Sequence, residues 1–388
     1  MEQSSILRFL KPSRPSQHPS RPENSRQENS RPGQPYHRRP DPDARNRHGQ
    51  GSKHRGPNNR RNADLKKVAD ETKAVLPEIL ADIPEFDAFE SSLINLEDTN
   101  PLSPADCPGF QKRARIRVLD MDSFDAAIQL DPHHDVHRHL GNTPPEDTKH
   151  DKAPEKDEDL GLNKLSTTDR EPKQTSGHSV IVLNLASERS PGGGWQKGAL
   201  AQEECLCYRS SLYLSLDPSF YPIPSLSAIY TPNVLLIRSS MANGHSLFPT
   251  TQLDSPSTLP AVSVVSVAAL RKPSLSDDVD DNNNRTFKHP GARATTKRKI
   301  RLVLRLAAQN KHTKLVLGAL GCGVFANPPH EVANCFAEVF DEPEFQGGWW
   351  EEVVFAVLDN VKSGSGEGGK DGKGNFGVFY RVLDGKEV

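Results

Sequence analysis

A strand-like run that ends in three consecutive glycines limits most strongly what this chain can fold into. Residues 180–186 (VIVLNLA) are apolar and rich in branched side chains, as expected of a buried strand. Gly192, Gly193 and Gly194 follow, and a helix-like segment begins near Gln202. Because glycine has no Cβ, its backbone approaches a ligand closely and turns N–H groups toward phosphate. The pattern predicts an α/β unit with a ligand site in its loop.

The same alternation of strand and helix continues along the chain. Helix-like segments are expected at residues 63–80, 122–130, about 200–215, 298–311 and 328–340, the second of them capped by Asp122 or Ser123. Strand-like segments are expected at residues 115–121, 229–239, 260–270, 314–320 and 352–359. This order predicts a central, mixed but largely parallel sheet between helical layers, with ligands beyond the carboxyl ends of its strands.

Composition indicates one large domain with a tail and insertions. Only 34% of the residues are hydrophobic and 32 are prolines, and the polar residues are concentrated in particular segments. Residues 1–64 are polar and basic and are expected to be disordered, because they cannot bury enough apolar surface. The remaining residues, 65–388, are expected to form one folded domain. Polar insertions are expected within it at about residues 133–178, 271–296 and 362–375.

Several protein classes are excluded by this sequence. It has no apolar run long enough to span a bilayer and no apolar signal-peptide core, so we expect a soluble intracellular protein with no membrane partner. Its five cysteines are too few and too scattered for a disulfide framework, and we expect reduced thiols. A tract with four histidines, residues 133–139, could ligate a metal, but a polar loop is the preferred interpretation and no metal is predicted.

A second glycine-rich loop follows the strand expected at residues 314–320. Gly318, Gly321 and Gly323 lie there, and a helix is expected to begin near Pro329. One such loop is a weak signal, because many are only tight connections between elements. Two loops at the same edge of one sheet, one of them followed by adjacent carboxylates, indicate a phosphate-containing ligand more specifically.

These motifs resemble the signature of poly(ADP-ribose) glycohydrolases (PARG), in which three glycines and a short spacer precede Gln-Glu-Glu. Here a seven-residue spacer separates Gly194 from Gln202-Glu203-Glu204. Segments such as VLNLASERSPGGGWQKGALAQEECL and LVLGALGCGVFANPPHEVANCF resemble the microbial-type branch of that family, and the resemblance runs over roughly residues 63–388. It implies a macrodomain-like three-layer α/β/α fold, binding of ADP-ribose, and hydrolysis of ribose–ribose O-glycosidic bonds with no metal and no cofactor.

The resemblance also implies different roles for the two acids. Hydrolysis of a glycosidic bond needs an acid to protonate the departing oxygen and a base to activate water. In the family the second glutamate of the motif serves both steps, which implies that Glu204 is catalytic. Glu203 would orient the departing ribose. The alternative for two glutamates at a helix start is a solvated N-terminus that the helix dipole favours.

Further ligand contacts are expected around both loops. Gly192, Gly193 and Gly194 are expected to surround the distal ribose and its phosphate, and Gln202 belongs to the same substrate-binding set. Asn184 either contacts a ribose hydroxyl or is only a strand-end turn residue. The backbone N–H groups of Gly321, Cys322, Gly323 and Val324 are expected to face the diphosphate. Phe325 stacks on a ribose or adenine, or anchors the core. Trp195 departs from the smaller apolar residue expected at its position.

The N-terminal tail contains a separate short motif. Gln3, Ile6, Phe9 and Leu10 fit a Q-x-x-I-x-x-F-L pattern that resembles peptides docking on the replication sliding clamp (PCNA), in which one helical turn presents an apolar plug. Leu10 replaces the usual second aromatic residue. The alternative is a fortuitous apolar cluster. Residues 1–60 carry thirteen Lys/Arg against five Asp/Glu, which predicts nuclear import, with a cytoplasmic fraction, or a patch for polyanions. A solvated tail is the alternative.

The expected function is therefore removal of poly(ADP-ribose) from modified proteins, as part of a response to DNA damage. Two alternatives remain open on the sequence. The chain could be a macrodomain that binds ADP-ribose without cleaving it, although the retained Gln-Glu-Glu motif argues against this. It could also remove single ADP-ribose units from modified substrates.

Overall fold

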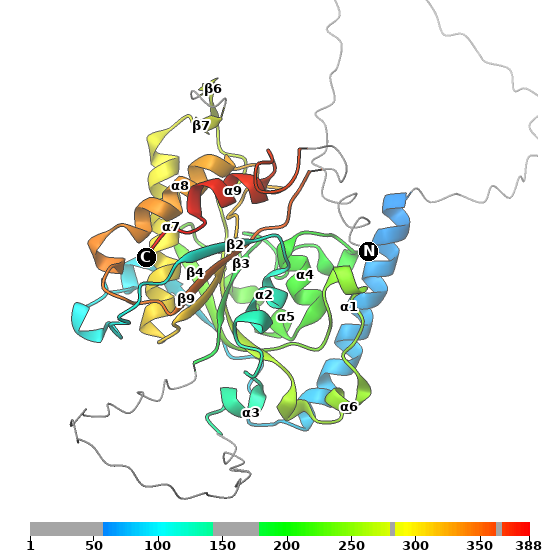
Figure 1. Cartoon of the computed structure of the whole chain (residues 1–388). Coiled ribbons are helices and arrows are strands. Elements are labelled where there is room, and N and C mark those ends of the chain that lie inside the picture. Colours follow the sequence, from blue (N-terminus) through cyan, green and yellow to red (C-terminus); the bar gives the residue numbers. More distant parts are fainter. Residues whose placement is uncertain (1–56, 143–177, 280–283, 362–366) are drawn as a thin grey trace, which may run out of the picture.

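The computed structural model describes residues 57–142, 178–279, 284–361 and 367–388. Its centre is a seven-stranded sheet in the order β1-β4-β5-β3-β8-β9-β2, flanked by helices on both faces (Figure 1). The strands from β5 to β2 are parallel to one another, whereas β4 is antiparallel to both β1 and β5. The mixed, largely parallel sheet between helical layers is thereby confirmed.

The strands are β1 (Ser92–Asn95), β2 (Ile116–Leu119), β3 (Ile181–Leu185), β4 (Ser227–Leu235), β5 (Ala261–Val267), β6 (Leu275–Val279), β7 (Arg285–Phe287), β8 (Lys314–Leu317) and β9 (Glu352–Ala356). The helices are α1 (Pro57–Ala81), α2 (Ser123–Leu130), α3 (Val136–His139), α4 (Gln202–Arg209), α5 (Leu212–Ser215), α6 (Thr250–Leu253), α7 (Pro290–Gln309), α8 (Pro329–Phe340) and α9 (Asn375–Leu383). In the described segments, no helix has the length and apolarity that crossing a bilayer requires.

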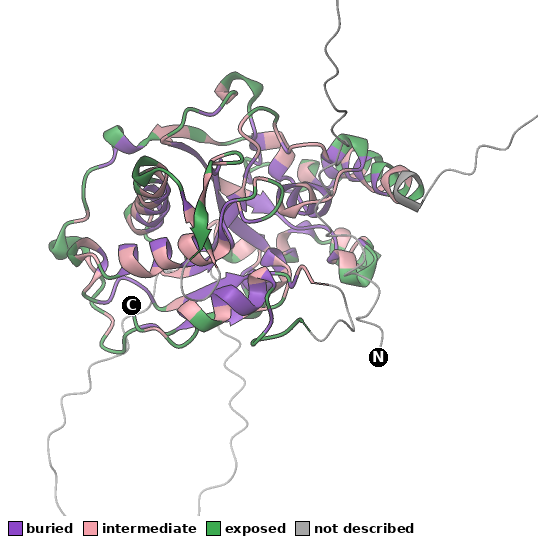
Figure 2. Ribbon diagram, turned by 90° about the horizontal axis from the view of Figure 1, so that it is seen from above, coloured by how far each residue is buried: buried purple, intermediate pink, exposed green. Residues whose placement is uncertain are grey.

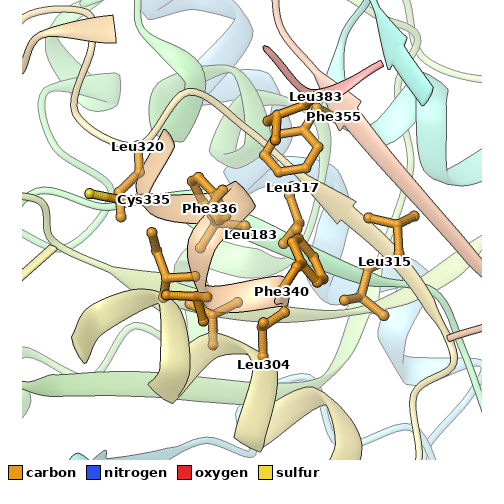
Figure 3. Packing of buried hydrophobic residues seen from close by; sticks show 14 of the residues in the cluster. Leu183, Leu304, Leu315, Leu317, Leu320, Cys335, Phe336, Phe340, Phe355 and Leu383 are labelled. Carbon is orange, nitrogen blue, oxygen red and sulfur yellow. The ribbon is translucent and has the colours of Figure 1, made fainter. Parts of the chain in front are cut away.

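Two hydrophobic cores lie on opposite faces of the sheet. Helices α7, α8 and α9 cover one face, where Phe336 of α8 packs edge-on against Phe355 of β9 at 4.9 Å between ring centroids (Figure 3). Helices α1, α2, α4 and α5 lie on the other face (Figure 1). Strand β5 is buried along its whole length, as expected for a central strand of a covered sheet. The burial colouring shows the same arrangement, with purple strands inside and exposed residues at the rim (Figure 2).

Helix α1 begins at Pro57, before the start expected near Ala63 and inside the segment 1–64 that was expected to be disordered. Its buried side chains Leu65, Ala69 and Leu76 recur at helical spacing. The first turns are polar and give no hydrophobic signal. They are helical in the structure because they lie against the loop that precedes α4, which only the tertiary structure shows.

The segment from residue 133 to 142 is part of the fold rather than of a polar insertion. Val136 is buried. The ring of His139 lies between two partners, with its Nδ1 at 3.1 Å from the Nε2 of His134 and its Nε2 at 2.9 Å from the Oδ1 of Asn233. Burial lowers the pKa of His134 to about 4, so this ring is neutral near pH 7. Two neutral imidazoles can form a hydrogen bond with each other inside the protein, whereas burial disfavours the charged form. Residues 143–177 of the expected insertion lie outside the described residues.

The segment expected as an insertion at residues 271–296 also carries structure. Strands β6 and β7 form a two-stranded sheet, and α7 begins at Pro290 rather than at residue 298. The first turns of α7 are polar because Arg293 pairs with Glu331 and Glu338 of α8. Their partners are charged residues on another helix, so the sequence shows no apolar stripe there.

Two further elements differ from expectation. The helix expected at about residues 200–215 is two helices, because Ser210 is extended, bridges to Leu236, and bonds its hydroxyl to the carbonyl of Leu206. Strand β1 was not expected at all. The predicted cap of α2 is confirmed, since the Asp122 carboxylate accepts from the N–H groups of Phe124 and Asp125.

The last residues of the chain run along the outer side of strand β2. Val388 donates its N–H to Ala114, Ile116 donates to Lys386, and Gly385 donates to Ile116, all at 2.8–2.9 Å. The Asp384 carboxylate accepts from the N–H of Val118 at 2.9 Å. This edge of the sheet is therefore closed by the chain itself.

Candidate active site

The Glu203 carboxyl lies buried beneath the end of strand β3. Its side chain projects from the first turn of α4, and only 3% of the residue is exposed. The N–H of Ser187 donates to it at 2.7 Å, and the N–H of Gly192 also donates to it. Burial raises its pKa to about 8; the Ser187 hydrogen bond opposes this rise, and the nearby charge of Glu204 adds to it. Glu203 therefore holds a proton near pH 7.

Glu204 is the more accessible of the two acids. It is only half-buried, and its Oε1 accepts from the N–H of Gly194 at 2.9 Å. Neighbouring helical residues point about 100° apart, so Glu203 faces the strand end while Glu204 faces the glycine loop. The structure thus separates the environments of the two carboxyls, as the assignment of different roles requires.

The glycines of the first loop make room for these acids. Gly192 and Gly193 have left-handed backbones, with φ of 66° and 60°. A Cβ on Gly193 would lie 2.5 Å from the Glu204 Oε1, and one on Gly192 would lie 2.7 Å from the Trp195 ring. The N–H groups were expected to face a ligand phosphate. In this structure Gly193 instead donates to Ser190, while Gly192 and Gly194 donate to the carboxyls of Glu203 and Glu204.

Trp195 forms the floor of the same loop. It is buried, and its ring lies 4.7 Å from that of Tyr213 and 6.1 Å from that of Tyr208. The Tyr208 hydroxyl lies within hydrogen-bonding distance of the carbonyls of Trp195 and Ala199, at 2.9 and 2.7 Å. The large Trp195 ring fits at this position, where a smaller residue was expected, because Gly192 has no side chain that would collide with it.

Gln202 and Asn184 connect helix α4 to strand β3. The Gln202 amide accepts from the N–H of Leu185 at 2.8 Å and donates to the carbonyl of Leu183 at 2.8 Å. Both ends of this amide are used within the protein, so Gln202 supports the site rather than contacting substrate as expected. Asn184 is fully buried and donates to Ser266 at 3.0 Å, while its Oδ1 has no hydrogen-bond partner among the described residues. Its ribose contact stays a prediction.

The second glycine loop follows strand β8, the neighbour of β3 in the sheet. Gly321 has φ of 75°, and a Cβ there would lie 2.5 Å from the Cβ of Ala269. The Cys322 N–H donates to Ala319 at 3.0 Å, which contradicts its expected role toward a diphosphate. The N–H groups of Gly321, Gly323 and Val324 have no partner in the part of the chain that the structure describes. These three groups remain candidates for anion binding.

The side chains of this loop divide between core and surface. Cys322 is buried, which raises its thiol pKa and makes it a filler rather than a nucleophile. Phe325 is half-buried and packs against the larger core, whereas Val324 is 73% exposed. Among the two interpretations of Phe325 the packing favours a partial anchor with one side still accessible.

Two residues near the acids carried no signal in the sequence. Ser187 supplies the N–H that holds Glu203, and a backbone donor of this kind leaves no mark on residue type. Tyr221 has a buried hydroxyl without a hydrogen-bond partner among the described residues, and its pKa is raised by burial and by the charge of Glu203. Its approach to Glu203 depends on the loop after α5, which the sequence does not position.

Other predicted sites lie elsewhere. Gln3, Ile6, Phe9 and Leu10 are outside the described residues. Among the residues with a described structure, no group of three His, Cys, Asp or Glu side chains is placed to hold a metal. The five cysteines are all free thiols.

The chain is similar to proteins of one known family. Residues 63–239 match the family model described as microbial-type PARG, catalytic domain. The fold is similar to crystal structures of PARG from Thermomonospora curvata, alone (22% identity, TM-score 0.53) and bound to the inhibitor ADP-HPD (23%, 0.52), each over 82% of this chain and 99% of the other. It is also similar to PARG from Deinococcus radiodurans in complex with ADP-ribose (26%, 0.50), over 76% and 93% of the two chains. A search of curated proteins gives no match.

Proposed function

Because residues 63–239 match the model of the microbial-type PARG catalytic domain, we propose that this chain hydrolyses the ribose–ribose O-glycosidic bonds of poly(ADP-ribose). Its fold is that of bacterial PARG structures, one of which contains ADP-ribose. The observation that carries the proposal is the contact between glycine loop and acids. Gly192 and Gly194 hold Glu203 and Glu204 through backbone N–H groups at the end of strand β3.

The chemistry follows from the accessibility of the acids. Glu204 is half-buried in the loop and can reach a bound ribose, whereas Glu203 lies almost fully inside. In the proposed reaction Glu204 protonates the departing ribose oxygen as the glycosidic bond breaks. Its carboxylate then takes a proton from the water that attacks the oxocarbenium-like sugar carbon, which restores the acid. Glu203 is protonated near pH 7 and can donate a hydrogen bond to the departing ribose.

Release of ADP-ribose from purified polymer tests this assignment. Glu204→Gln keeps the shape of the side chain but removes the proton donor, so turnover is expected to fall by about a thousandfold or more. Affinity for ADP-ribose should stay within about threefold. Glu188→Gln is the matched control, because its half-buried carboxyl lies on the same loop region and pairs with Arg189.

Two outcomes would redirect the proposal. A wild-type protein that binds ADP-ribose but hydrolyses no polymer and no ADP-ribosylated protein would be a binding module. Activity on mono-modified proteins, without activity on polymer, would make it a hydrolase of single ADP-ribose units. Polymer and mono-modified substrates should therefore be assayed side by side.

We also propose a setting for this activity. The α/β/α layers support its placement among macrodomains, and the basic residues before Pro57 support nuclear import, with a cytoplasmic fraction, and a part in the response to DNA damage. The motif of Gln3, Ile6, Phe9 and Leu10 supports docking on the replication sliding clamp. A peptide of residues 1–12 should bind the clamp, and Ile6→Ala with Phe9→Ala should remove that binding. No binding at high micromolar peptide would dismiss the partner.

A further inference from the structure

Three cationic residues flank the contact between helix α1 and the turn after the first glycine loop, and none has a role in the site described above. Helix α1 packs so closely on the turn after Trp195 that a Cβ on Gly198 would overlap the carbonyl oxygen of Asn62. Arg60 and Arg61 precede Asn62, and Lys197 precedes Gly198. We call Arg60, Arg61 and Lys197 the α1–loop surface.

Two of the three charges of this surface are exposed. Arg60 and Lys197 are exposed, and in the described part of the chain neither has a carboxylate within ion-pair distance. Arg61 is half-buried near Tyr208; burial raises the pKa of that phenol and the Arg61 charge opposes the rise. Exposed cations with no partner attract polyanions at low energetic cost, because no ion pair has to be broken.

The arrangement of the two glycine loops gives a substrate a direction. The second loop leads into α8, on one face of the sheet, and the first leads into α4, on the opposite face, where α1 also lies (Figure 1). A ligand that bridges both loops therefore crosses the sheet edge from the α8 side toward the α1 side. The Cα atoms of Gly194, which holds Glu204, and Gly198 are four residues apart and at most about 15 Å from each other.

We propose that the α1–loop surface binds the phosphates of the ADP-ribose units on the leaving side of the scissile bond. Each such unit carries a diphosphate, and the polymer must continue past Glu204 in the direction of α1 once its terminal unit occupies the two loops. This inference rests on the proposed function and adds a binding surface for the part of the polymer that lies beyond the two glycine loops.

The test compares the full chain with two double charge-reversal variants. Arg60→Glu/Lys197→Glu changes the surface, and Lys112→Glu/Arg298→Glu makes the same charge change at exposed positions elsewhere. The first variant should raise KM for polymer about tenfold and weaken the dependence of KM on salt concentration, since fewer phosphate contacts release fewer counterions. Affinity for free ADP-ribose should be unchanged in both variants, which also shows that the site is folded. The control should behave as wild type.

Binding measured in the Glu204→Gln background separates this inference from the proposed function. If wild type does not cleave polymer, the proposed function fails, and polymer affinity still tests the surface. Polymer affinity and salt dependence equal to those of the control would overturn the inference. A loss of nucleic-acid affinity with unchanged polymer affinity would overturn it as well, because the surface would then serve nucleic acid.

Discussion

The two glycine loops look alike in the sequence but use their glycines differently. In the first loop the protein's own atoms take up the space, because the Glu204 carboxyl and the Trp195 ring lie where side chains of Gly193 and Gly192 would be. In the second loop only Gly321 is crowded in this way, and no atom lies within 4 Å of a Cβ built on Gly323. The backbone N–H groups of the two loops differ likewise. In the first loop, two of them donate to the carboxyls of the acids, whereas in the second loop three N–H groups have no partner among the described residues.

This difference indicates that the first loop organises the acids, whereas the second keeps the open space and the N–H donors that the proposed ligand contact requires. Glycine is required in the first loop for the internal structure of the site. At Gly323 it is compatible with a close approach from outside. The same residue type at two strand ends thus serves positioning in one place and access in the other.

Among the changes that test this contrast between the loops, Gly193→Ala is expected to have the largest effect. The backbone there is left-handed and the new methyl group would displace the Glu204 carboxyl, so turnover of polymer should fall by about a hundredfold or more. Gly385→Ala controls for backbone strain, because Gly385 has φ of 80° but open space around it. Steady-state hydrolysis of polymer measures both. Equal activity of the two variants would show that Gly193 does not position Glu204.

The next effect is a dependence of stability on pH that comes from Glu203. Its pKa rises from 4.5 in the unfolded chain to about 8 in the folded protein, so between these values the folded state holds more protons than the unfolded state. The free energy of unfolding should therefore fall as pH rises from 4.5 to 8 and then level off. At about 1.4 kcal/mol per pKa unit, the ionised group costs at most about 5 kcal/mol above pH 8.

Glu203→Gln tests this sign. The amide keeps an oxygen for the N–H groups of Ser187 and Gly192 and does not ionise. The gain in stability of the variant over wild type should be largest at pH 8 and above and smallest near pH 5, as measured by urea denaturation across that range. A constant difference at all pH values would contradict the buried, protonated carboxyl.

The smallest effects are expected in the second loop, where two neighbouring glycines should behave differently. Gly321→Ala should lower the free energy of unfolding by about 1–3 kcal/mol, because it combines a left-handed backbone with a contact on Ala269. Gly323→Ala should change that free energy by less than about 0.5 kcal/mol and should instead weaken ADP-ribose binding. Thermal unfolding and calorimetric titration separate the two. Equal destabilisation by both changes would remove the contrast between the loops.

Much of the architecture is visible in the sequence because apolar periodicity carries it. Strand β5 is an unbroken run of small and branched residues, and α8 places Val332, Phe336 and Val339 on one buried face. The elements that escape prediction depend on distant partners. The start of α7 pairs with α8 through Arg293, and His139 of α3 bonds to the buried ring of His134, so their polar residues resemble a loop.

The site likewise has features that the sequence predicts and features that depend on the folded backbone. The spacing of the three glycines and of Glu203 and Glu204 predicts that the first loop lies beside the acids, and the structure brings the two into contact. What their spacing does not show is the pairing of N–H groups with each acid, the use of both ends of the Gln202 amide inside the protein, or the internal bond made by Cys322. These depend on backbone direction, which residue type does not record.

The closed edge at strand β2 bears on how the protein behaves at high concentration. An outer strand with bare N–H and C=O groups is a template on which a second molecule can add its own strand. Here Gly385, Lys386 and Val388, together with the Asp384 carboxylate, already occupy those groups between Ala114 and Val118. Sheet extension from this side would first require peeling away the final turn and the residues after it. The geometry thus protects the parallel half of the sheet against edge-to-edge aggregation.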